Sequence, residues 1–484
     1  MALSPTLLRE LTALLGGGLL VAAEQTVAFE CDALTAHRHR PGAVALPRTA
    51  DEVFAVLAAC HRHRTPVVAR GAGTGLSGGA LPIADGVLLV LSRLDRILEL
   101  DPGRRLARVQ PGVTNLAISE AAAPYGLYYA PDPSSQVACT IGGNVAENSG
   151  GVHCLKYGLT VHNVLEIKVA TIDGELLTLG SEMGEAPGLA LLPLLTGSEG
   201  MLGVVVEVTV QLRPMAERVE LILAAFDSVK SCAEAVSTLI ASGIIPAGLE
   251  MMDAPAIQAS EAFAQCGYPC DAAALLLCEV DGLPAEVTFQ LERAQSLLRN
   301  AGATSLRVAA DADERQRMWS GRKSAFPAVG RLAPDYYCMD GTIPRRHLAD
   351  VLERIDAMSK QYGLAVANVF HAGDGNLHPL IMFDAGSGDE LHRAEAFGAA
   401  ILELCVAVGG TVTGEHGVGV EKLGPMCTQF GAAELEVFHA VKHAFDPQTL
   451  LNPGKAVPTL ARCADYGALR VHGGKLPHAH LPRF

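Results

Sequence analysis

Two histidines flank a short glycine-containing turn in the segment VFHAGDGNLHP, residues 369–379. If Asp374–Gly375 forms a two-residue type I′ turn, His371 lies directly opposite His378. Directly opposed residues on paired strands share one face, with their Cβ atoms about 4.5–5.5 Å apart. Two imidazoles at that spacing can hold one metal ion. The sequence therefore predicts a metal-binding hairpin.

A carboxylate and a third imidazole follow within Gly414–Glu415–His416–Gly417. The flanking glycines permit a close approach of the backbone. Two histidines and one glutamate form a known metal-ligand set that leaves one coordination position open. A single histidine is more often a hydrogen-bonded part of a core. A pair in register, together with a glycine-flanked Glu–His, favours a metal site over that alternative.

The residues of a second candidate site lie much earlier, in the loop RGAGTGLSGGA at residues 70–80, which directly follows the apolar run Val67–Val68–Ala69. Five of its eleven residues are glycine. Successive backbone N–H groups in such a loop form a concavity that suits phosphate, and Arg70 adds a positive charge. We interpret the loop as a diphosphate cradle for a dinucleotide. A glycine-rich hairpin without a ligand is the alternative.

The spacing of Gly73, Gly75 and Gly78 also satisfies the G-x-G-x-x-G fingerprint of NAD-binding proteins. That fingerprint requires the loop to open a helix whose N-terminus receives the diphosphate. Pro82 and Gly86 interrupt the following residues, and a strand-like run begins at Val87, so a helix has no room there. The sequence therefore argues against NAD.

A second glycine-rich stretch, between residues 128 and 158, has few strand signals. Its Gly142–Gly143–Asn144 and Asn148–Gly151 segments predict tight turns with amide groups able to contact ribose, diphosphate or a flavin ring. Asp173–Gly174 is a strong two-residue hairpin signal. The other predicted elements up to residue 215 are a helix over 51–63 and strands over 87–91, 107–113, 164–171, 175–179 and 204–210. Together they predict a mixed α+β cofactor domain.

From residue 219 onward, strand-like runs are separated by helical ones. The predicted strands span 219–225, 273–280, 366–371 and 379–383, and the predicted helices span 230–242, 286–301, 346–362, 390–408 and 432–445. This order favours an antiparallel sheet with helices on one face. We interpret it as a second domain that caps the cofactor. His472, His478 and His480 lie in a Pro/Gly-rich tail without an organising spacing, and we interpret them as surface residues.

Composition excludes several classes of protein. The formal net charge of −15 argues against nucleic-acid binding. No apolar run approaches the roughly 20 residues that cross a bilayer, and we interpret Leu11–Ala23 as an amphipathic or buried helix. The 12 cysteines lack the close repeats of an iron–sulfur site and are typical of reduced thiols in a cytoplasmic protein.

Six motifs, in this order, resemble a known family: RGAGTGLSGGALP, PDPSSQVACTIGGNVAENSGG, TGSEGMLGVVVEVTV, VFHAGDGNLHP, TGEHGVG and LLNPGK. They are similar to those of the FAD-linked D-2-hydroxy-acid dehydrogenases of the vanillyl-alcohol-oxidase superfamily, with the flavin subunit of bacterial glycolate oxidases the nearest match. The resemblance implies an α+β fold: a PCMH-type FAD-binding domain, an antiparallel-sheet substrate (cap) domain and a C-terminal helical return segment. The implied domains are an N-terminal helical segment at 1–40, the FAD domain at 41–215, the cap at 216–430 and the return segment at 431–484.

The same resemblance implies the chemistry and its residues. FAD, bound without a covalent link because Thr74 stands where covalently linked relatives often carry histidine, would oxidise glycolate to glyoxylate. Arg322 would pair with the substrate carboxylate, and His416 would act as the base. His371, His378 and Glu415 would hold a divalent metal, Zn²⁺ or a similar ion. The implied FAD contacts are Arg70, Gly71, Ala72, Gly73, Thr74, Gly75, Leu76, Ser77, Gly78, Pro131, Asp132, Ser134, Ser135, Thr140, Gly142, Gly143, Asn144, Asn148, Ser149, Gly150, Gly151, Glu199, Gly203, Val204 and Asn452.

Two positions depart from the family pattern. Leu380 stands where some metal-bearing relatives carry a polar residue, and Cys338 stands where relatives carry a lysine that helps bind the carboxylate; Lys323 is a candidate replacement for that lysine. D-lactate and D-2-hydroxyglutarate therefore remain alternative substrates, and a non-catalytic flavin-binding subunit is the alternative of a different class. The implied partners are a second flavin-type subunit and an iron–sulfur subunit of a glycolate oxidase complex. We expect a cytoplasmic protein that meets a membrane only through such partners.

Overall fold

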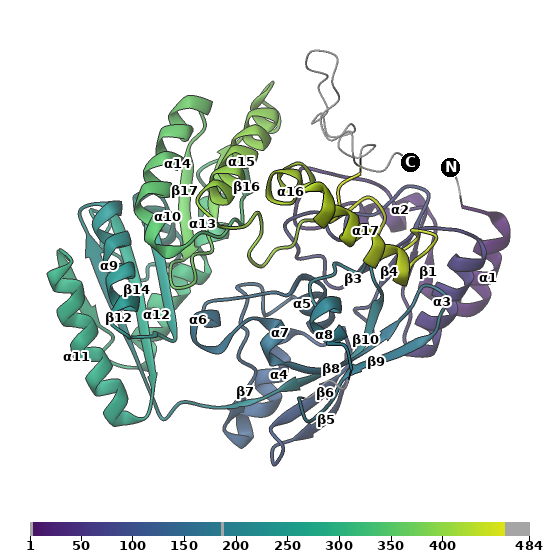
Figure 1. Ribbon diagram of the computed structural model, residues 1–484, viewed down its shortest axis with the longest axis horizontal. Helices are drawn as coiled ribbons and strands as arrows, with labels where there is room; N and C mark the ends of the chain where they lie inside the picture. The colour runs from purple at the N-terminus through teal and green to yellow at the C-terminus, as the bar shows by residue number, and fades with distance from the viewer. Residues whose placement is uncertain (1–2, 185–187, 460–484) are drawn as a thin grey trace. The chain divides into compact units, whose positions relative to one another are not determined.

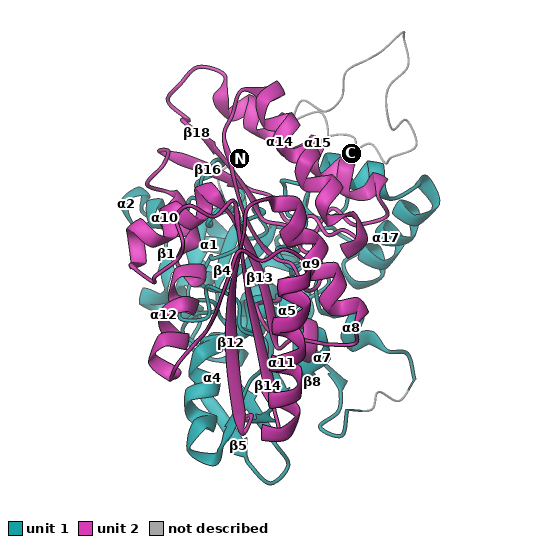
Figure 2. Ribbon diagram, turned by 90° about the vertical axis from the view of Figure 1, so that its left-hand side faces the viewer, with its two compact units in different colours: residues 1–149, 159–214, 415–484 teal, residues 150–158, 215–414 magenta. Residues whose placement is uncertain are grey.

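The computed structural model describes residues 3–184 and 188–459, so the tail histidines lie outside the described residues. The chain forms two compact units (Figure 2). Unit 1 comprises residues 1–149, 159–214 and 415–484, and unit 2 comprises residues 150–158 and 215–414. Both units thus combine segments that are distant in sequence, whereas the sequence analysis divided the chain into contiguous domains, and those boundaries stay a prediction.

The first sheet of unit 1 carries the glycine-rich loop. Its order is β1 (Leu19–Leu20), β2 (Ala43–Ala45), β4 (Val87–Val90) and β3 (Val67–Arg70), and β2, β4 and β3 are parallel. Helices α1 (Pro5–Leu15) and α3 (Ala50–Arg62) bury Leu7, Leu11, Val56 and Leu57 in the core beside this sheet. No helix lies between β3 and β4 in the described chain, which confirms the argument against an NAD-type loop.

One predicted helix of unit 1 is wrong in its second half. The run Leu11–Ala23 is α-helical as far as Leu15, where α1 ends, continues as a 3₁₀ helix over Gly16–Gly18 and is a strand at Leu19–Leu20. Three consecutive glycines follow α1, and Gly16 adopts φ +52°. Glycine is unfavourable inside a helix and common just after its end, which accounts for the break.

The second sheet of unit 1 is antiparallel, in the order β5 (Ile97–Asp101), β6 (Leu106–Val109), β10 (Val204–Gln211), β8 (Val164–Ala170) and β9 (Leu176–Gly180). The predicted hairpin between β8 and β9 is confirmed, with a three-residue loop in which Gly174 has φ +87°. The smaller elements of unit 1 are α2 (Ala23–Thr26), α4 (Asn115–Ala122), β7 (Leu127–Tyr128), α5 (Ile141–Glu147), α7 (Thr160–Asn163), α8 (Leu191–Leu195), β11 (Arg213–Pro214), α16 (Leu423–Gln429) and α17 (Ala432–Phe445).

Unit 2 is built on one antiparallel sheet (Figure 1). Its strand order is β15 (Ser305–Val308), β12 (Arg218–Phe226), β14 (Ala274–Gly282), β13 (Gly248–Asp253), β17 (Val366–His371), β18 (Pro379–Phe383) and β16 (Asp335–Cys338). The four predicted strands correspond to β12, β14, β17 and β18. The sequence analysis missed β13, β15 and β16.

Helices cover both faces of this sheet, so the prediction of helices on one face is wrong. Helices α9 (Val229–Ala241) and α11 (Pro284–Asn300) lie on one side of β12 and β14, and α10 (Ala254–Ala264) and α12 (Ala312–Lys323) lie on the other (Figure 2). Consecutive residues of β13 and β14 are buried, as cover on both faces requires. The remaining helices of unit 2 are α6 (Cys154–Tyr157), α13 (Ala325–Val329), α14 (Leu348–Tyr362) and α15 (Glu390–Ala407).

None of the helices in residues 3–184 and 188–459 combines the length and the apolarity that crossing a bilayer requires.

Candidate functional site

The glycine-rich loop after β3 presents a row of backbone donors without acceptors. No backbone N–H of residues 72–79 donates a hydrogen bond to another described residue. The carbonyls of Gly75 and Ser77, in contrast, accept from Ala33 and Val420 at 3.1 and 3.0 Å. Ser77 Oγ is buried and also lacks a hydrogen-bond partner among these residues. A row of N–H groups without acceptors among the described residues suits a ligand rich in acceptors, such as a diphosphate.

The geometry of the loop separates the roles of its glycines. Gly73 and Gly78 have φ near +76°, and a Cβ on either would overlap Arg70 or Val420. A Cβ on Gly75 would meet nothing within 4 Å, so the backbone there borders open space. Gly73 and Gly78 therefore shape the loop, and Gly75 leaves room beside it.

Arg70 has an internal role in addition to the predicted phosphate contact. Its Nη1 donates to the carbonyl of Cys31 at 2.6 Å, and the guanidinium lies 5.9 Å from the ring centroid of Phe29. Partial burial lowers the pKa of Arg70. The side chain thus ties the start of the loop to residues 29–31, and its contact with phosphate stays a prediction.

The far end of the loop is fixed by a segment from much later in the chain. The Asn452 side-chain amide donates to the carbonyls of Gly79 (3.0 Å) and Glu199 (2.7 Å), and Lys455 Nζ donates to Gly79 O at 2.8 Å. The Asp32 carboxylate accepts from the backbone N–H of Ala80 at 3.2 Å. The structure therefore brings the predicted return segment LLNPGK to the glycine-rich loop. Asp32 and Lys455 were missed by the sequence analysis.

Several predicted cofactor residues lie around α5, next to this loop. Gly71 has no room for a Cβ because Thr140, the N-cap of α5, lies 2.3 Å from that position. Gly142 packs against Pro111 in the same way, and Asn144 accepts a hydrogen bond from Asn115 at 3.1 Å. Gly142 and Gly143 lie inside α5, so the prediction of tight turns there is wrong.

Other residues predicted to contact the cofactor also make contacts within the protein, and their cofactor contacts stay predictions. The Asn148 side chain accepts from the Val161 N–H at 2.9 Å, and Gly203, just before Val204 at the start of β10, has no room for a Cβ because of Val169. Ser149 accepts from Thr160 through its carbonyl. The remaining predicted residues follow: Pro131, Asp132, Ser134 and Ser135 lie in the coil before α5, and Gly150 and Gly151 begin the first segment of unit 2.

Glu199 has an internal role in addition to the predicted cofactor contact, which stays a prediction. Its carboxylate accepts from the backbone N–H groups of Val418 and Gly419, both at 2.7 Å, and so holds the loop that follows His416. Glu147 lies beside it, since a Cβ on Gly417 would approach Oε2 of Glu147 to 2.1 Å. Burial raises the pKa of Glu199, and burial together with the nearby charge of Glu199 raises the pKa of Glu147 well above its usual range. The Glu199 carboxylate thus accepts two backbone N–H groups, whereas Oε2 of Glu147 has no hydrogen-bond partner among the described residues.

In unit 2, the histidine hairpin has a different register from the predicted one. Asn368 pairs with Pro379, and His371 pairs with Asn376, which places His378 opposite Val369. The loop has four residues rather than two, which shifts the register by two positions. Because side chains alternate between faces with a period of two, this shift keeps both histidines on one face. Their ring centroids lie 5.1 Å apart, so the predicted pairing partner is wrong and the predicted proximity is confirmed.

Each ring of the pair has one nitrogen close to an internal acceptor. His371 Nδ1 lies 2.8 Å from Oε1 of Glu250, and His378 Nδ1 lies 3.3 Å from the carbonyl of Met339. With Nδ1 donating, each Nε2 carries a lone pair. Histidines that bind metals are oriented by such hydrogen bonds to a carboxylate or carbonyl. The donor set therefore fits a divalent metal.

Arg322 is joined to the same group. Its Nη2 lies 2.6 Å from Oε2 of Glu250, and both side chains are only 1% exposed. No guanidinium nitrogen of Arg322 has a hydrogen bond of good geometry to another described residue. A buried guanidinium with donors to spare fits a carboxylate ligand. Glu250 is a functional residue that the sequence analysis missed, although a glutamate inside the apolar run GLEMMD was the available signal.

The residue before Glu415 and His416, Gly414, is held in place by other residues of unit 2. Gly414 donates its backbone N–H to the Asp340 carbonyl at 2.9 Å and has no room for a Cβ beside Asn376. Consecutive Cα atoms are 3.80 Å apart, so the Cα of Glu415 lies one such step from the glycine that unit 2 holds in place. The side chains of Glu415 and His416 lie 3.8 Å apart. These two residues group with unit 1, and their approach to the hairpin histidines stays a prediction.

Comparison with known families settles the class of protein. A family model described as an FAD binding domain matches residues 41–180, and one described as the C-terminal domain of FAD linked oxidases matches residues 215–456. The chain belongs to the FAD-linked oxidase family. This FAD-linked oxidase is 61% identical over 466 residues to the glycolate oxidase subunit GlcD of Escherichia coli (strain K12), covering 96% of this chain and 93% of the relative.

More distant relatives carry other names. The FAD-linked oxidase is 38% identical to the glycolate oxidase subunit GlcD of Bacillus subtilis (strain 168), over 90% of this chain and 93% of that protein. It is 30% identical to the probable mitochondrial D-lactate dehydrogenase of Danio rerio, over 87% and 85%. A structure of p-cresol methylhydroxylase with substrate bound shares the fold, with a TM-score of 0.78 at 17% identity, over 94% of this chain and 97% of that one.

These comparisons confirm the predicted PCMH-type FAD-binding domain with its antiparallel-sheet companion, and FAD as the cofactor of an oxidoreductase. The backbone N–H groups of residues 72–79, which have no acceptor among the described residues, agree with an FAD-binding domain.

Proposed function

We propose that this FAD-linked oxidase oxidises glycolate to glyoxylate as the flavin subunit of a larger glycolate oxidase. The observation that carries the proposal is the 61% identity to the E. coli glycolate oxidase subunit GlcD over almost the whole of both chains. The buried, under-bonded Arg322 beside the oriented histidine pair supports it, because a small 2-hydroxy acid presents a carboxylate and a neighbouring hydroxyl.

The residues divide the task as follows. Arg322 pairs with the substrate carboxylate and fixes the orientation of Cα. His371, His378 and Glu415 would hold a divalent metal, which would lower the pKa of the substrate hydroxyl. His416 accepts the hydroxyl proton, a role typically worth about 10²–10⁴-fold in rate. FAD, held without a covalent link along residues 70–79, supplies the two-electron acceptor.

The substrate is tested by turnover of the purified chain on glycolate, D-lactate and D-2-hydroxyglutarate with a redox dye as acceptor. We expect glycolate to give the highest kcat/KM. A clear preference for either of the other acids would replace glycolate as the substrate. No turnover on any acid, by protein with its full complement of FAD, would favour the non-catalytic subunit.

The electron route is tested with the same protein. The loop after β3 opens no helix of the NAD type, so we expect dye reduction and very little NAD reduction. Electrons would then leave through a second flavin-type subunit and an iron–sulfur subunit. Rapid NAD reduction by the isolated chain would contradict this route.

The metal and the base are tested by variants that spare the flavin. His378→Ala should lose both metal, by elemental analysis, and activity, while the flavin spectrum is kept. His416→Asn should retain metal and flavin and lose about 10²–10⁴-fold in turnover. Metal-free wild-type protein with full activity would remove the metal from the mechanism. Acid precipitation should leave yellow FAD in the supernatant, since Thr74 offers no covalent link.

A further inference from the structure

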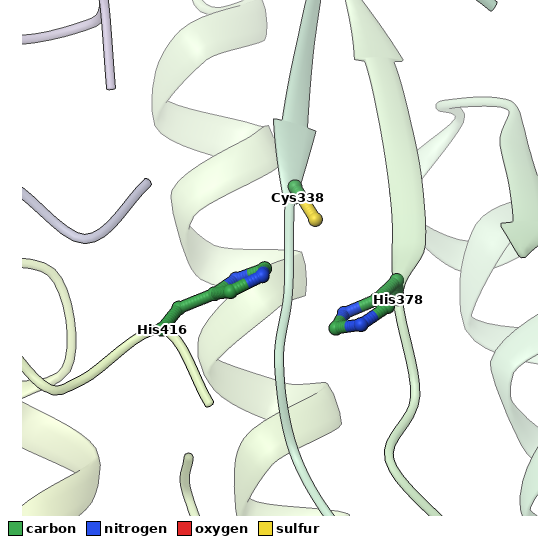
Figure 3. Close-up of side chains that lie close together, drawn as sticks. All are labelled: Cys338, His378 and His416. Carbon is green, nitrogen blue, oxygen red and sulfur yellow. The ribbon is translucent and has the colours of Figure 1, made fainter. Parts of the chain in front are cut away.

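A thiol lies beside the histidine pair, within unit 2. Cys338 ends strand β16 and pairs with Leu380 of β18, two residues beyond His378. Its Sγ and a ring nitrogen of His378 lie within 4.8 Å of each other, and the residues are 4% and 1% exposed. Figure 3 shows Cys338 and His378 on their neighbouring strands. The two departures from the family pattern, Cys338 and Leu380, are therefore cross-strand neighbours.

The backbone between the two strands fixes this arrangement. The Met339 N–H donates to the Pro379 carbonyl at 3.1 Å, and the Met339 carbonyl lies 3.3 Å from Nδ1 of His378. Two donors on a hydrogen-bonded pair of strands keep their spacing without a flexible loop between them. His371, whose ring nitrogen also lies within 4.8 Å of one on His378, adds a third donor on the same sheet.

We propose that Cys338 is a thiolate ligand of the metal held by His371 and His378, an inference that rests on the metal of the proposed function. Zn²⁺ binds nitrogen at about 2.0–2.1 Å and sulfur at about 2.3 Å, so a tetrahedral ion separates such ligands by about 3.6 Å. Sγ of Cys338 lies within 4.8 Å of a ring nitrogen of His378, and a ring nitrogen of His371 lies within 4.8 Å of one on His378, so side-chain rotation would bring the sulfur and both rings onto one ion. Metal binding releases the thiol proton to solvent and forms one metal–sulfur bond.

The proposal also sets the identity and the resting state of the metal. Thiolate and imidazole together favour Zn²⁺ over hard ions such as Mg²⁺ and Mn²⁺. The two histidines of unit 2 would leave further positions of a tetrahedral ion open. Cys338 would fill one of them in the absence of substrate, and apolar Leu380, its cross-strand neighbour, provides no competing oxygen ligand.

X-ray absorption at the zinc edge tests the proposal on the flavin-loaded full chain after titration with one equivalent of Zn²⁺. This signal comes from the metal alone, so FAD does not interfere. Wild-type protein should show one sulfur at about 2.3 Å beside nitrogen and oxygen ligands. Cys338→Ser should bind zinc and lose the sulfur shell. Cys278→Ser, which alters a fully buried thiol on β14 of the same sheet, should keep it.

The outcomes separate this inference from the proposed function. A wild-type spectrum with nitrogen and oxygen ligands only would overturn the role of Cys338, whatever the activity. A sulfur shell that survives in Cys338→Ser would do the same. A sulfur shell in zinc-loaded protein, combined with full activity of metal-free protein, would support the Cys338 site and reject the metal from the proposed mechanism. A wild-type spectrum without sulfur overturns the proposal by itself, so the test can fail even if a variant does not fold.

Discussion

Replacing Glu250 with glutamine tests the buried charge network of unit 2. Glu250 lies 2.6 Å from Arg322 and 2.8 Å from His371 Nδ1 through different oxygens, and its side chain is 1% exposed. Glu250→Gln keeps the shape and removes the negative charge that faces Arg322. Breaking a buried ion pair on one side typically costs about 3–5 kcal/mol, because the remaining charge has no partner.

The expected changes follow from that loss. For a unit of this size, about 2–4 °C per kcal/mol corresponds to a fall of about 6–20 °C in Tm. A glutamine N–H that donates to His371 Nδ1 would also move the proton of His371 to Nε2, the nitrogen that a metal needs. We therefore expect zinc affinity to fall by about 10–100-fold, as for other residues that orient metal ligands.

Thermal unfolding and zinc titration of the flavin-loaded protein measure both effects. Glu234→Gln, an exposed change of the same kind on α9, is the matched control and should alter neither quantity. If Glu250→Gln melts at the wild-type temperature and binds zinc with wild-type affinity, the network does not carry the charge interactions inferred from its distances.

Three further predictions concern Glu147, the glycine-rich loop and Arg322. The raised pKa of Glu147 means that the folded state binds a proton more tightly than the unfolded chain, so stability is lost as pH rises from the unfolded-state pKa towards the folded-state pKa. Between about pH 5 and about pH 8, Tm should therefore fall less in Glu147→Gln than in wild type. Parallel plots of Tm against pH for the two proteins would contradict this. Gly75→Ala should leave the Tm of the flavin-free protein unchanged but weaken FAD binding by about 5- to 150-fold, the equivalent of 1–3 kcal/mol of overpacking. Flavin titration measures this change, and Gly17→Ala, where a Cβ also meets nothing within 4 Å, is the control. Arg322→Lys should lower kcat/KM for glycolate by about 10- to 150-fold, the equivalent of one charged hydrogen bond of about 1.5–3 kcal/mol, and leave the flavin spectrum unchanged. A wild-type kcat/KM in this variant would remove Arg322 from the substrate site.

Local patterns predicted most of the elements near the sites. The predicted strands 366–371 and 379–383 and the helix 432–445 agree with the structure residue for residue, because hydrophobic period and turn residues are read from neighbouring positions. The hairpin register was not predictable at that level, since Asp374–Gly375 is compatible with a two-residue or a four-residue loop. The two alternatives differ by two positions and so present the same face.

Long-range polar contacts were beyond the sequence. Glu250, Asp340 and Lys455 acquire their roles only through partners that are far away in the chain. Glu199 was predicted from family resemblance as a cofactor contact, which stays a prediction, while the bonds of its carboxylate to two backbone amides were not foreseen. A single sequence identifies residue types suited to chemistry but not which neighbours compete for their donors and acceptors.

The return of residues 450–455 to β3 has a consequence for biosynthesis. Val67 exchanges backbone hydrogen bonds with Leu450 and Asn452, at 2.8 and 2.7 Å, so an edge made early in synthesis waits for a segment made late. At roughly 5–20 residues per second, residues 215–414 alone occupy a ribosome for about 10–40 s between the two. Until then, the loop at residues 70–80 lacks the Asn452 and Lys455 contacts that hold its far end. Nascent chains interrupted in that interval should therefore bind FAD poorly, which reserves the cofactor for chains that have been read through to residue 455.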